Sequence, residues 1–266
     1  MTARAVALAV IAGAALTAAP GAALAAARLE CTAESRAEVA PTLAVVALNA
    51  GDEPAREVRP EVLYQHHTYA GEAATLEPGA RREWRLALVP PPSPGTFAAT
   101  VHVRYRDALS RWRSVPLVAQ VPAPDGSPVL ARLALEVRPV GRAGSATLLV
   151  ENPDSRPIAG RVVLVLGDGL ATDPESLPVE VAAHGRTTVP LVLENRGALT
   201  PGSYPAYALF EYGDAGAHHA AVAHAEVSVV AQAGGARARP LLVGVGALAA
   251  TIALLAVAWR RAAARA

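Results

Sequence analysis

Histidines are the side chains of this sequence whose types and spacing come closest to a metal-binding pattern. His66 and His67 are adjacent, as are His218 and His219, and His224 follows the second pair. Successive residues of a strand point to opposite faces, so neither pair chelates one ion in regular strand geometry. His218 and His224 share a face but lie about 20 Å apart on an extended strand. We therefore expect no metal site; the alternative is an ion held where separate loops converge.

Motifs for catalysis or cofactor binding are not found elsewhere in the sequence. It has no Gly-x-Ser-x-Gly elbow, no phosphate-binding loop and no HExxH helix. Gly167-Asp168-Gly169 resembles a fragment of a nucleotide or calcium loop, but neither a helix nor further spaced carboxylates follow it, which favours a turn. We expect a protein that is not an enzyme, binds no cofactor and has no small-molecule ligand.

One group of residues fits protein recognition. Tyr105, Arg111, Trp112 and Arg113 crowd a predicted hairpin near the middle of the chain. Arginine and tryptophan are residue types that anchor protein interfaces. Our hypothesis is a partner-binding edge at this hairpin. The alternative is a tryptophan that covers the end of a β-sandwich, with solvated arginines beside it.

The charge balance narrows the class of partner. The 266-residue chain has a formal net charge of +1 and contains no lysine, so arginine supplies all of the positive side-chain charge. A nucleic-acid-binding protein needs a basic face that displaces counterions from phosphates, so we exclude that class. A carbohydrate- or cell-wall-binding module is an alternative. It is weakened by an aromatic content of 4%, because sugar sites usually present stacking rings.

The only cysteine, Cys31, excludes an internal disulfide, so the core has to be stable without cross-links. Lipid attachment at Cys31 is disfavoured because the charged Glu30 stands where a lipidation site carries a small residue. We expect an idle or buried thiol at the start of the first strand.

The N-terminus has the features of a secretory signal peptide. Arg4 supplies a positive charge, and an apolar stretch of about 11 residues runs from Val6 to Leu16, which is too short to span a bilayer. Small residues follow in the Ala-x-Ala pattern, so cleavage is expected after Ala25 or Ala27. An uncleaved membrane anchor is the alternative.

The C-terminus has the features of a membrane anchor. An uncharged apolar run of about 19 residues extends from Leu241 to Trp259, which is close to the length needed to cross a bilayer. Arg260 and Arg261 follow, and positive residues stay on the cytoplasmic side, so the bulk of the chain is expected outside the cytoplasm. Two alternatives are a buried helix of a soluble domain and a sorting tail that is cut and replaced.

The middle of the chain is predicted to be made of strands. Short apolar runs alternate with Pro, Gly, Asn and Asp, and no amphipathic helix is evident. The alternation of buried and exposed types has a period of two, which is typical of strands with one buried face. The predicted strands are Thr42–Asn49, Val58–Tyr69, Arg82–Val89 and Phe97–Tyr105.

The strand region contains an internal repeat. Four landmarks recur in the same order at an offset of about 105 residues, a length that suits a sandwich of about seven strands. The pairs are Asn49 with Asn152, Gly79 with Gly185, Pro94-Gly95-Thr96-Phe97 with Pro201-Gly202-Ser203-Tyr204, and Tyr105-Arg106-Asp107-Ala108 with Tyr212-Gly213-Asp214-Ala215.

These landmarks resemble those of the bacterial and archaeal Ig-like modules of the CARDB and NEW3 type. The resemblance covers most of residues 29–232, and it departs at Ala183-His184-Gly185, where the Pro-Gly pair is missing. It implies extracytoplasmic β-sandwiches, often in tandem and next to a membrane helix. It also implies adhesion, scaffolding or presentation of a partner, and it brings no shared catalytic residues.

The sequence thus predicts an all-β chain with two tandem Ig-like β-sandwich domains plus one C-terminal transmembrane helix. The predicted boundaries are a signal peptide at 1–27, sandwiches at 28–122 and 129–232, a transmembrane helix at 240–259 and a cytoplasmic tail at 260–266. The predicted function is that of a non-catalytic, membrane-anchored envelope protein. It would contact other envelope or membrane proteins, or serve as an accessory subunit of a membrane complex. A metal-handling accessory role is the least favoured alternative.

Overall fold

The computed structural model describes residues 26–36, 40–123 and 128–231. All sixteen elements in these ranges are β-strands, which confirms the prediction of an all-β chain for the described part. No helix long and apolar enough to cross a membrane occurs in these ranges. The predicted signal peptide up to residue 25, the predicted helix 240–259 with Leu241 and Trp259, and the tail 260–266 with Arg260 and Arg261 lie outside the described residues.

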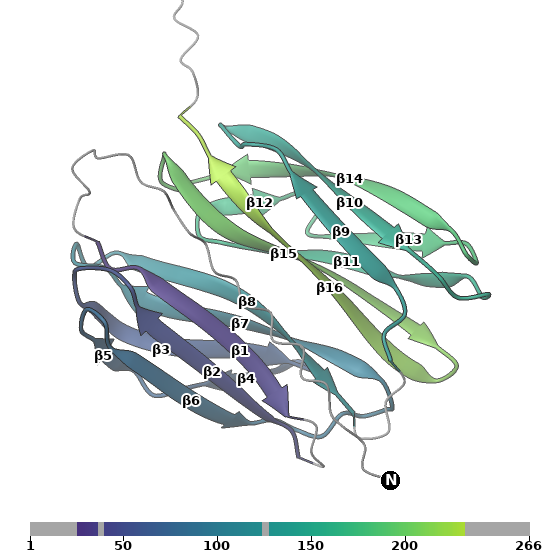
Figure 1. The fold of residues 1–266 in the computed structure, drawn as a ribbon, viewed down its shortest axis with the longest axis horizontal. Coiled ribbons are helices and arrows are strands. Elements are labelled where there is room, and N and C mark those ends of the chain that lie inside the picture. Colours follow the sequence, from purple (N-terminus) through teal and green to yellow (C-terminus); the bar gives the residue numbers. More distant parts are fainter. Residues whose placement is uncertain (1–25, 37–39, 124–127, 232–266) are drawn as a thin grey trace, which may run out of the picture. The chain divides into compact units, whose positions relative to one another are not determined.

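Strands β1–β8 form a first β-sandwich (Figure 1). One sheet has the order β1-β2-β6, and the other has the order β4-β3-β7-β8 with β5 paired to β3. All pairings are antiparallel. The strands are β1 (Leu29–Arg36), β2 (Thr42–Asn49), β3 (Ala55–Tyr64), β4 (His67–Ala70), β5 (Ala74–Leu76), β6 (Arg81–Ala87), β7 (Thr96–Arg106) and β8 (Trp112–Pro122).

Strands β9–β16 form a second β-sandwich with the same plan. Its sheets have the orders β12-β14-β10-β9 and β13-β11-β15-β16, so that β9, β10 and β14 correspond to β1, β2 and β6. This shared order supports the internal repeat. The strands are β9 (Arg132–Val137), β10 (Ala143–Glu151), β11 (Ile158–Leu166), β12 (Leu170–Thr172), β13 (Ser176–Val181), β14 (Arg186–Asn195), β15 (Gly202–Asp214) and β16 (Ala217–Val229).

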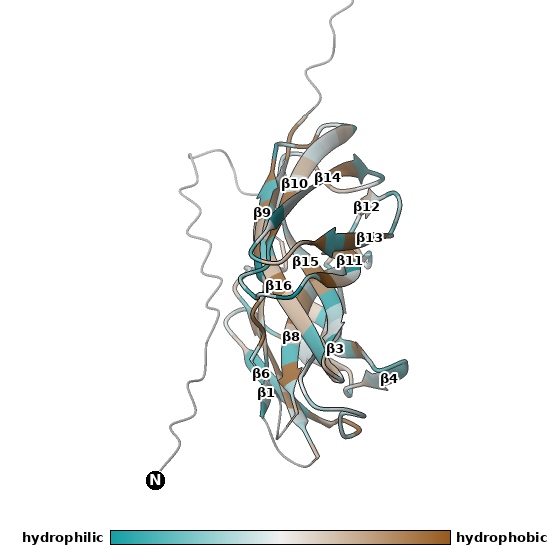
Figure 2. Cartoon of the chain, turned by 90° about the vertical axis from the view of Figure 1, so that its right-hand side faces the viewer, coloured by the Kyte–Doolittle hydropathy of each residue, from teal (hydrophilic) through white to brown (hydrophobic). Residues whose placement is uncertain are grey.

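Each sandwich encloses an apolar core between its two sheets. Alternate residues of β2 and β7 are buried, and hydrophilic and hydrophobic residues follow one another along the strands in Figure 2. The first core contains Leu43, Val45, Val62, Val101 and Trp84, and the second contains Leu148, Val150, Leu193, Ala208 and Phe210. Burial of such side chains is the main stabilising term of a fold without disulfides.

The strand predictions hold except at one place. Thr42–Asn49 is confirmed as β2, and the predictions around β6 and β7 are correct to within two residues. The single run Val58–Tyr69 was wrong, because Gln65 and His66 adopt positive φ angles of 48° and 64° and form the tight turn that separates β3 from β4. This turn type matches the right-handed twist of the two strands that it joins.

The buried side chain of Asn49 ties together the two places where the first sandwich crosses between its sheets. Its Nδ2 donates to the carbonyl of Glu53, in the β2–β3 crossing, at 2.8 Å, and to that of Leu76, the last residue of β5, at 2.9 Å. Its Oδ1 accepts from the backbone N–H of Gly51 at 3.1 Å. Asn49 is 0% exposed, so these bonds are shielded from water.

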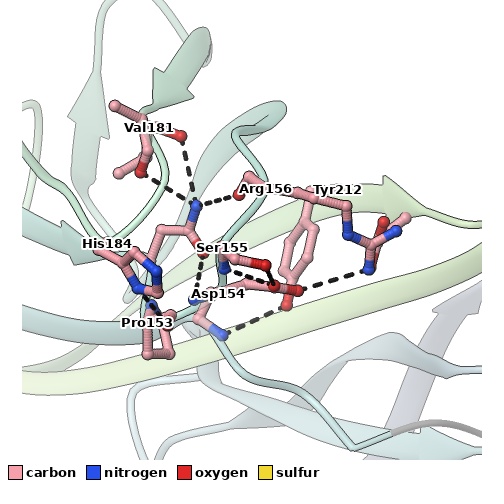
Figure 3. Close-up of polar contacts among 11 residues, drawn as sticks. Pro153, Asp154, Ser155, Arg156, Val181, His184 and Tyr212 are labelled. Atoms are coloured by element: carbon pink, nitrogen blue, oxygen red, sulfur yellow. Dashed lines mark hydrogen bonds and ion pairs between the residues drawn. The ribbon is translucent and has the colours of Figure 1, made fainter.

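Asn152 repeats this arrangement in the second sandwich, and Figure 3 labels two residues whose carbonyls it bonds, Arg156 and Val181. Its Nδ2 donates to the carbonyls of Arg156 at 2.7 Å and Ala182 at 3.1 Å, and its Oδ1 accepts from the N–H of Asp154 at 3.0 Å. The ring of His184 contacts the carbonyl of Pro153 through Nδ1 at 2.9 Å. The repeated Asn is therefore more than a turn residue. Its buried side chain hydrogen-bonds two segments that each connect one sheet of the sandwich to the other.

A second repeated residue, Tyr105 and its counterpart Tyr212, anchors the start of each sandwich. The hydroxyl of Tyr105 donates to the carbonyl of Ala27 at 3.4 Å, and that of Tyr212 accepts from the N–H of Ala131 at 3.3 Å. Tyr105 is 8% exposed, and burial raises the pKa of its hydroxyl to about 12. Both tyrosines thus fix the backbone just before the first strand of their sandwich.

The two sandwiches belong to one compact unit that ends at Val230. The N–H of His218 in β16 donates to the carbonyl of Pro94 at 2.9 Å, and the His218 ring stacks on Phe97 with ring centroids 4.4 Å apart. Gln120 of β8 donates through Nε2 to the carbonyl of Ala220 at 2.7 Å. The Pro94-Gly95 turn of the first sandwich and the adjacent Phe97 therefore contact the β15–β16 hairpin of the second.

The buried asparagines generate the first prediction. Asn49→Ala and Asn152→Ala should each lower the free energy of unfolding by about 2–4 kcal/mol, because each leaves more than one buried carbonyl without its donor. Asn195→Ala is the control, since within the described residues the side chain of Asn195 bonds only the nearby turn residues Gly197 and Ala198. Urea unfolding of the full chain in a neutral detergent measures the change. Equal costs for all three variants would contradict the assignment.

Candidate protein-binding surface

Trp112 forms the centre of a cation–π cluster on the outer face of the sheet β4-β3-β7-β8. The guanidinium carbons of Arg106, Arg104 and Arg59 lie 4.7, 4.9 and 5.9 Å from its ring centroid. Trp112 pairs with Arg106 across β7 and β8, and Arg59 pairs with Arg104 across β3 and β7. Each contact of this kind contributes about 0.5–1 kcal/mol at an exposed site.

A β-bulge in β3 places Arg59 in this cluster. The register with β7 shifts between Arg56 and Arg59, so three steps along β3 match two steps along β7. Because side chains alternate between faces, the extra residue keeps Arg59 on the outer face opposite Arg104 while Val58 stays in the core. Glu57, which has a φ of 52°, lies in the bulge.

Two glutamates hold the arginines in place without covering them. Glu61 accepts from Arg104 Nη1 through both carboxylate oxygens, at 3.4 and 3.3 Å, and its Oε1 lies 3.0 Å from Arg59 Nη2. Glu57 Oε1 lies 3.1 Å from Arg106 Nε. Between 37% and 40% of each arginine side chain is exposed, so the ion pairs contribute little to stability and more to orientation.

Asp107 builds the hairpin turn beside the cluster. Its Oδ1 accepts from the N–H groups of Leu109 at 3.0 Å and Arg111 at 2.9 Å, and its Oδ2 accepts from Arg113 Nε at 3.1 Å. Burial acts to raise the pKa of the Asp107 carboxyl, but these hydrogen bonds and the Arg113 charge outweigh it, so the pKa is lowered. The turn presents Leu109 at its tip, where 71% of the residue is exposed.

The structure separates the four residues that the sequence singled out. Trp112 is 38% exposed and Arg111 is exposed beside it, whereas Arg113 turns back to Asp107. Tyr105 faces the core, so its assignment to the partner-binding edge has to be corrected: on β7 it alternates with the outward-facing Arg104 and Arg106. We call Arg59, Arg104, Arg106, Leu109, Arg111 and Trp112 the Trp112 surface.

Part of this surface could be found in the sequence. The period of two along β7 places Arg104 and Arg106 on the same face, opposite to that of Tyr105. No comparable signal exists for Arg59, because its face depends on the bulge and its neighbours belong to a strand far away in the sequence. Arg59 could therefore not be found from the sequence, whereas Arg104 and Arg106 could have been found and were missed.

The second sandwich has a cavity of about 250 Å³, whose lining includes Asp154, Arg156 and Tyr212, labelled in Figure 3. Arg156 pairs with Asp214 at 2.5 Å and with Asp154 at 3.5 Å. His219 lines the cavity, is 4% exposed and stacks on Tyr212 with ring centroids 5.0 Å apart. Burial lowers the pKa of the His219 ring, with the Asp214 charge acting in the opposite direction.

The remaining candidates for chemistry lie apart. In the described ranges, no group of three or more His, Cys, Asp or Glu side chains could hold a metal ion. His66 lies in a turn and His67 begins β4, while His218 and His224 lie on β16. Burial, with a contribution from the charge of Glu30, raises the pKa of the Cys31 thiol to about 12, so this thiol stays protonated. Gly167-Asp168-Gly169 is a turn between β11 and β12, as expected.

Comparisons with known proteins give only distant structural likeness. No family model and no curated protein matches the chain. Red sea bream transglutaminase is 16% identical, with a TM-score of 0.31 over 77% of this chain and 32% of that one. Elastase-activated Escherichia coli alpha-2-macroglobulin is 13% identical, with a TM-score of 0.31 over 79% of this chain and 22% of that one.

A third solved structure, the periplasmic chaperone SfaE, is 12% identical, with a TM-score of 0.34 over 77% of this chain and all of that one. This chain therefore spans about a third or less of the first two proteins and the whole length of the chaperone. Likeness at these identities and TM-scores carries no information about the function of this chain.

The buried histidine generates the second prediction. Because the pKa of His219 is lowered in the folded state, the unfolded state takes up the proton first as the pH falls below about 6.5, and the free energy of unfolding decreases. His219→Phe keeps a ring on Tyr212 and removes this titration. Stability should then fall less between pH 7.5 and 5.5, as measured by urea unfolding at each pH. The exposed His67→Phe is the control, and an unchanged pH dependence in His219→Phe would refute the assignment.

Proposed function

We propose that this chain is a non-catalytic protein of a bacterial-type cell envelope that recruits another envelope or membrane protein. The Trp112 surface is the observation that carries the proposal. It combines an exposed tryptophan with arginines that are already ordered by stacking and by ion pairs, and these are the residue types found at interface hot spots. Ordering before binding lowers the entropic cost of association.

The geometry disfavours the carbohydrate-binding alternative. Sugar recognition uses an open aromatic face, and the ring of Trp112 already has the guanidinium groups of Arg104 and Arg106 within 4.9 Å of its centroid. The cavity of the second sandwich is lined by groups that are committed to the fold, since Asn152 bonds backbone carbonyls and Arg156 bridges two carboxylates. A protein partner suits the exposed surface better.

The proposed location rests on the two ends of the sequence. A signal peptide at 1–27 would export the chain, and the apolar run Leu241–Trp259 followed by Arg260 and Arg261 would hold it in the membrane with its tail in the cytoplasm. The last described strand, β16, ends at Val229, so the stretch that would link the sandwiches to the bilayer is short. Partners in the same membrane are therefore favoured.

Membrane anchoring is the third prediction. The full chain, produced in a bacterial host, should remain in the membrane pellet after extraction with alkaline carbonate, because an apolar span of this length does not partition into water. A variant that ends at Ala231 should appear in the extracytoplasmic soluble fraction. Fractionation followed by immunodetection measures both. Recovery of both forms in the cytoplasm would contradict export.

Partner recruitment is the fourth prediction. A photo-crosslinking amino acid at Leu109 should give a discrete adduct with one membrane or envelope protein in the native host, because this position is the exposed tip of the Trp112 surface. The adduct should be lost when Trp112→Ala is added. The same probe at Val192, which is 53% exposed on the second sandwich, is the matched control. The proposal fails if Trp112→Ala leaves the Leu109 adduct unchanged, or if both positions give the same adducts.

A further inference from the structure

The Trp112 surface carries an excess of positive charge. Arg56, which pairs with Arg106 across β3 and β7, and Arg111 add to the three stacked arginines. Among the residues that the structure describes, the carboxylates that face this group are Glu57, Glu61 and Asp168. Asp107 is not counted with them because it pairs with Arg113. A local excess of two charges stands out in a chain whose formal net charge is +1 over all 266 residues. Such a patch attracts acidic partners and repels basic ones.

The arginines also have unused hydrogen-bond donors. A guanidinium has five N–H groups, and two glutamates accept only a few of those that Arg59, Arg104 and Arg106 offer. The Nε atom of Arg59 is buried and makes no hydrogen bond within the described part of the chain, whereas that of Arg106 lies 3.1 Å from Glu57 Oε1. The three guanidinium carbons lie within 5.9 Å of one ring centroid, and each guanidinium can offer two parallel N–H groups to a carboxylate.

The internal repeat shows that this surface is particular to the first sandwich. Trp112 pairs with Arg106, and the repeat aligns this pair with His218 and Gly213. His218 stacks on Phe97, and its Nε2 lies 3.5 Å from Glu211. The same position therefore carries a histidine that stacks on Phe97 in one copy and a tryptophan surrounded by arginines in the other.

We infer that the Trp112 surface binds a short acidic segment of a partner protein, in which Asp or Glu carboxylates alternate with an apolar side chain. The carboxylates take the free N–H groups of Arg104 and Arg106, and the apolar side chain packs against Leu109 and the exposed edge of Trp112. Leu109 and Trp112 favour a peptide over free phosphate or a lipid headgroup, which offers charge without an apolar neighbour at that spacing. This inference rests on the proposed function and names the chemistry of the partner.

The test uses the full chain in a neutral detergent and a fluorescein-labelled peptide of repeated Asp-Leu-Glu. Fluorescence anisotropy at low salt should show binding, and the matched Asn-Leu-Gln peptide should bind at least about tenfold more weakly, because charge-assisted bonds are lost. Raising NaCl from 50 to 300 mM should weaken binding of the acidic peptide, since the surface is exposed to screening ions.

Variants locate the site. Arg104→Gln should weaken binding of the acidic peptide about tenfold, and Arg104→Lys should weaken it less, because the charge remains while stacking and the paired donors are lost. Arg186→Gln makes the same charge change on the second sandwich, where Arg186 lies 4.0 Å from Glu151, and should leave the affinity unchanged. An unaltered thermal unfolding midpoint of Arg104→Gln shows that the fold is intact.

Three results would overturn the inference. They are equal affinity for the acidic and amide peptides, equal weakening by Arg104→Gln and Arg186→Gln, and displacement of the peptide by inorganic phosphate or anionic lipid vesicles beyond the effect of matched NaCl. The crosslink from Leu109 separates this inference from the proposed function. If the adduct forms and depends on Trp112 but the acidic peptide does not bind, the proposed recruitment of a partner is supported and the inference of an acidic segment is refuted. If the acidic peptide binds but no adduct forms in the host, the proposed recruitment of a partner there is refuted.

Discussion

A buried amide in each sandwich is the interaction on which the rest of the structure depends. A β-sandwich without disulfides has to keep its two sheets in register where the chain crosses from one to the other, and exposed turns alone do this poorly. Asn49 bonds both crossings of the first sandwich, and Asn152 does the same in the second. A buried carbonyl without a hydrogen-bond donor raises the free energy of the folded state. These bonds therefore restrict the backbone conformations that each connecting segment can adopt.

The outer surfaces follow from this constraint. Once the crossings are fixed, β3 and β7 lie side by side, and the bulge in β3 places Arg59 opposite Arg104. The three guanidinium groups then meet the ring of Trp112 at the start of β8, where the Asp107 turn brings the chain back. The repeat uses the same scaffold differently. The counterpart of Trp112 in the second sandwich, His218, stacks on Phe97 of the first sandwich instead of contacting arginines.

The sequence was informative where periodicity or turn chemistry decides the structure. The period of two predicted β2 and β7, and the repeated turn residues predicted two modules of similar length. The same reasoning failed at Gln65 and His66, because nothing in their types indicates that both adopt positive φ. Tyr105 was misassigned because its neighbours in sequence, Arg104 and Arg106, point away from it. Arg59 was missed because a bulge is a property of two paired strands.

The positions of Asn49 and Asn152 also affect the chemical stability of their side chains. Asparagine deamidates when the backbone nitrogen of the next residue attacks the side-chain carbonyl and closes a five-membered ring. In the second sandwich that next residue is Pro153, which has no N–H to lose. In the first, the N–H of Ala50 is held by the carbonyl of Arg28 at 2.8 Å. Both amides are thus protected from slow deamidation. Conversion of either amide to a carboxylate would place a negative charge inside a sandwich.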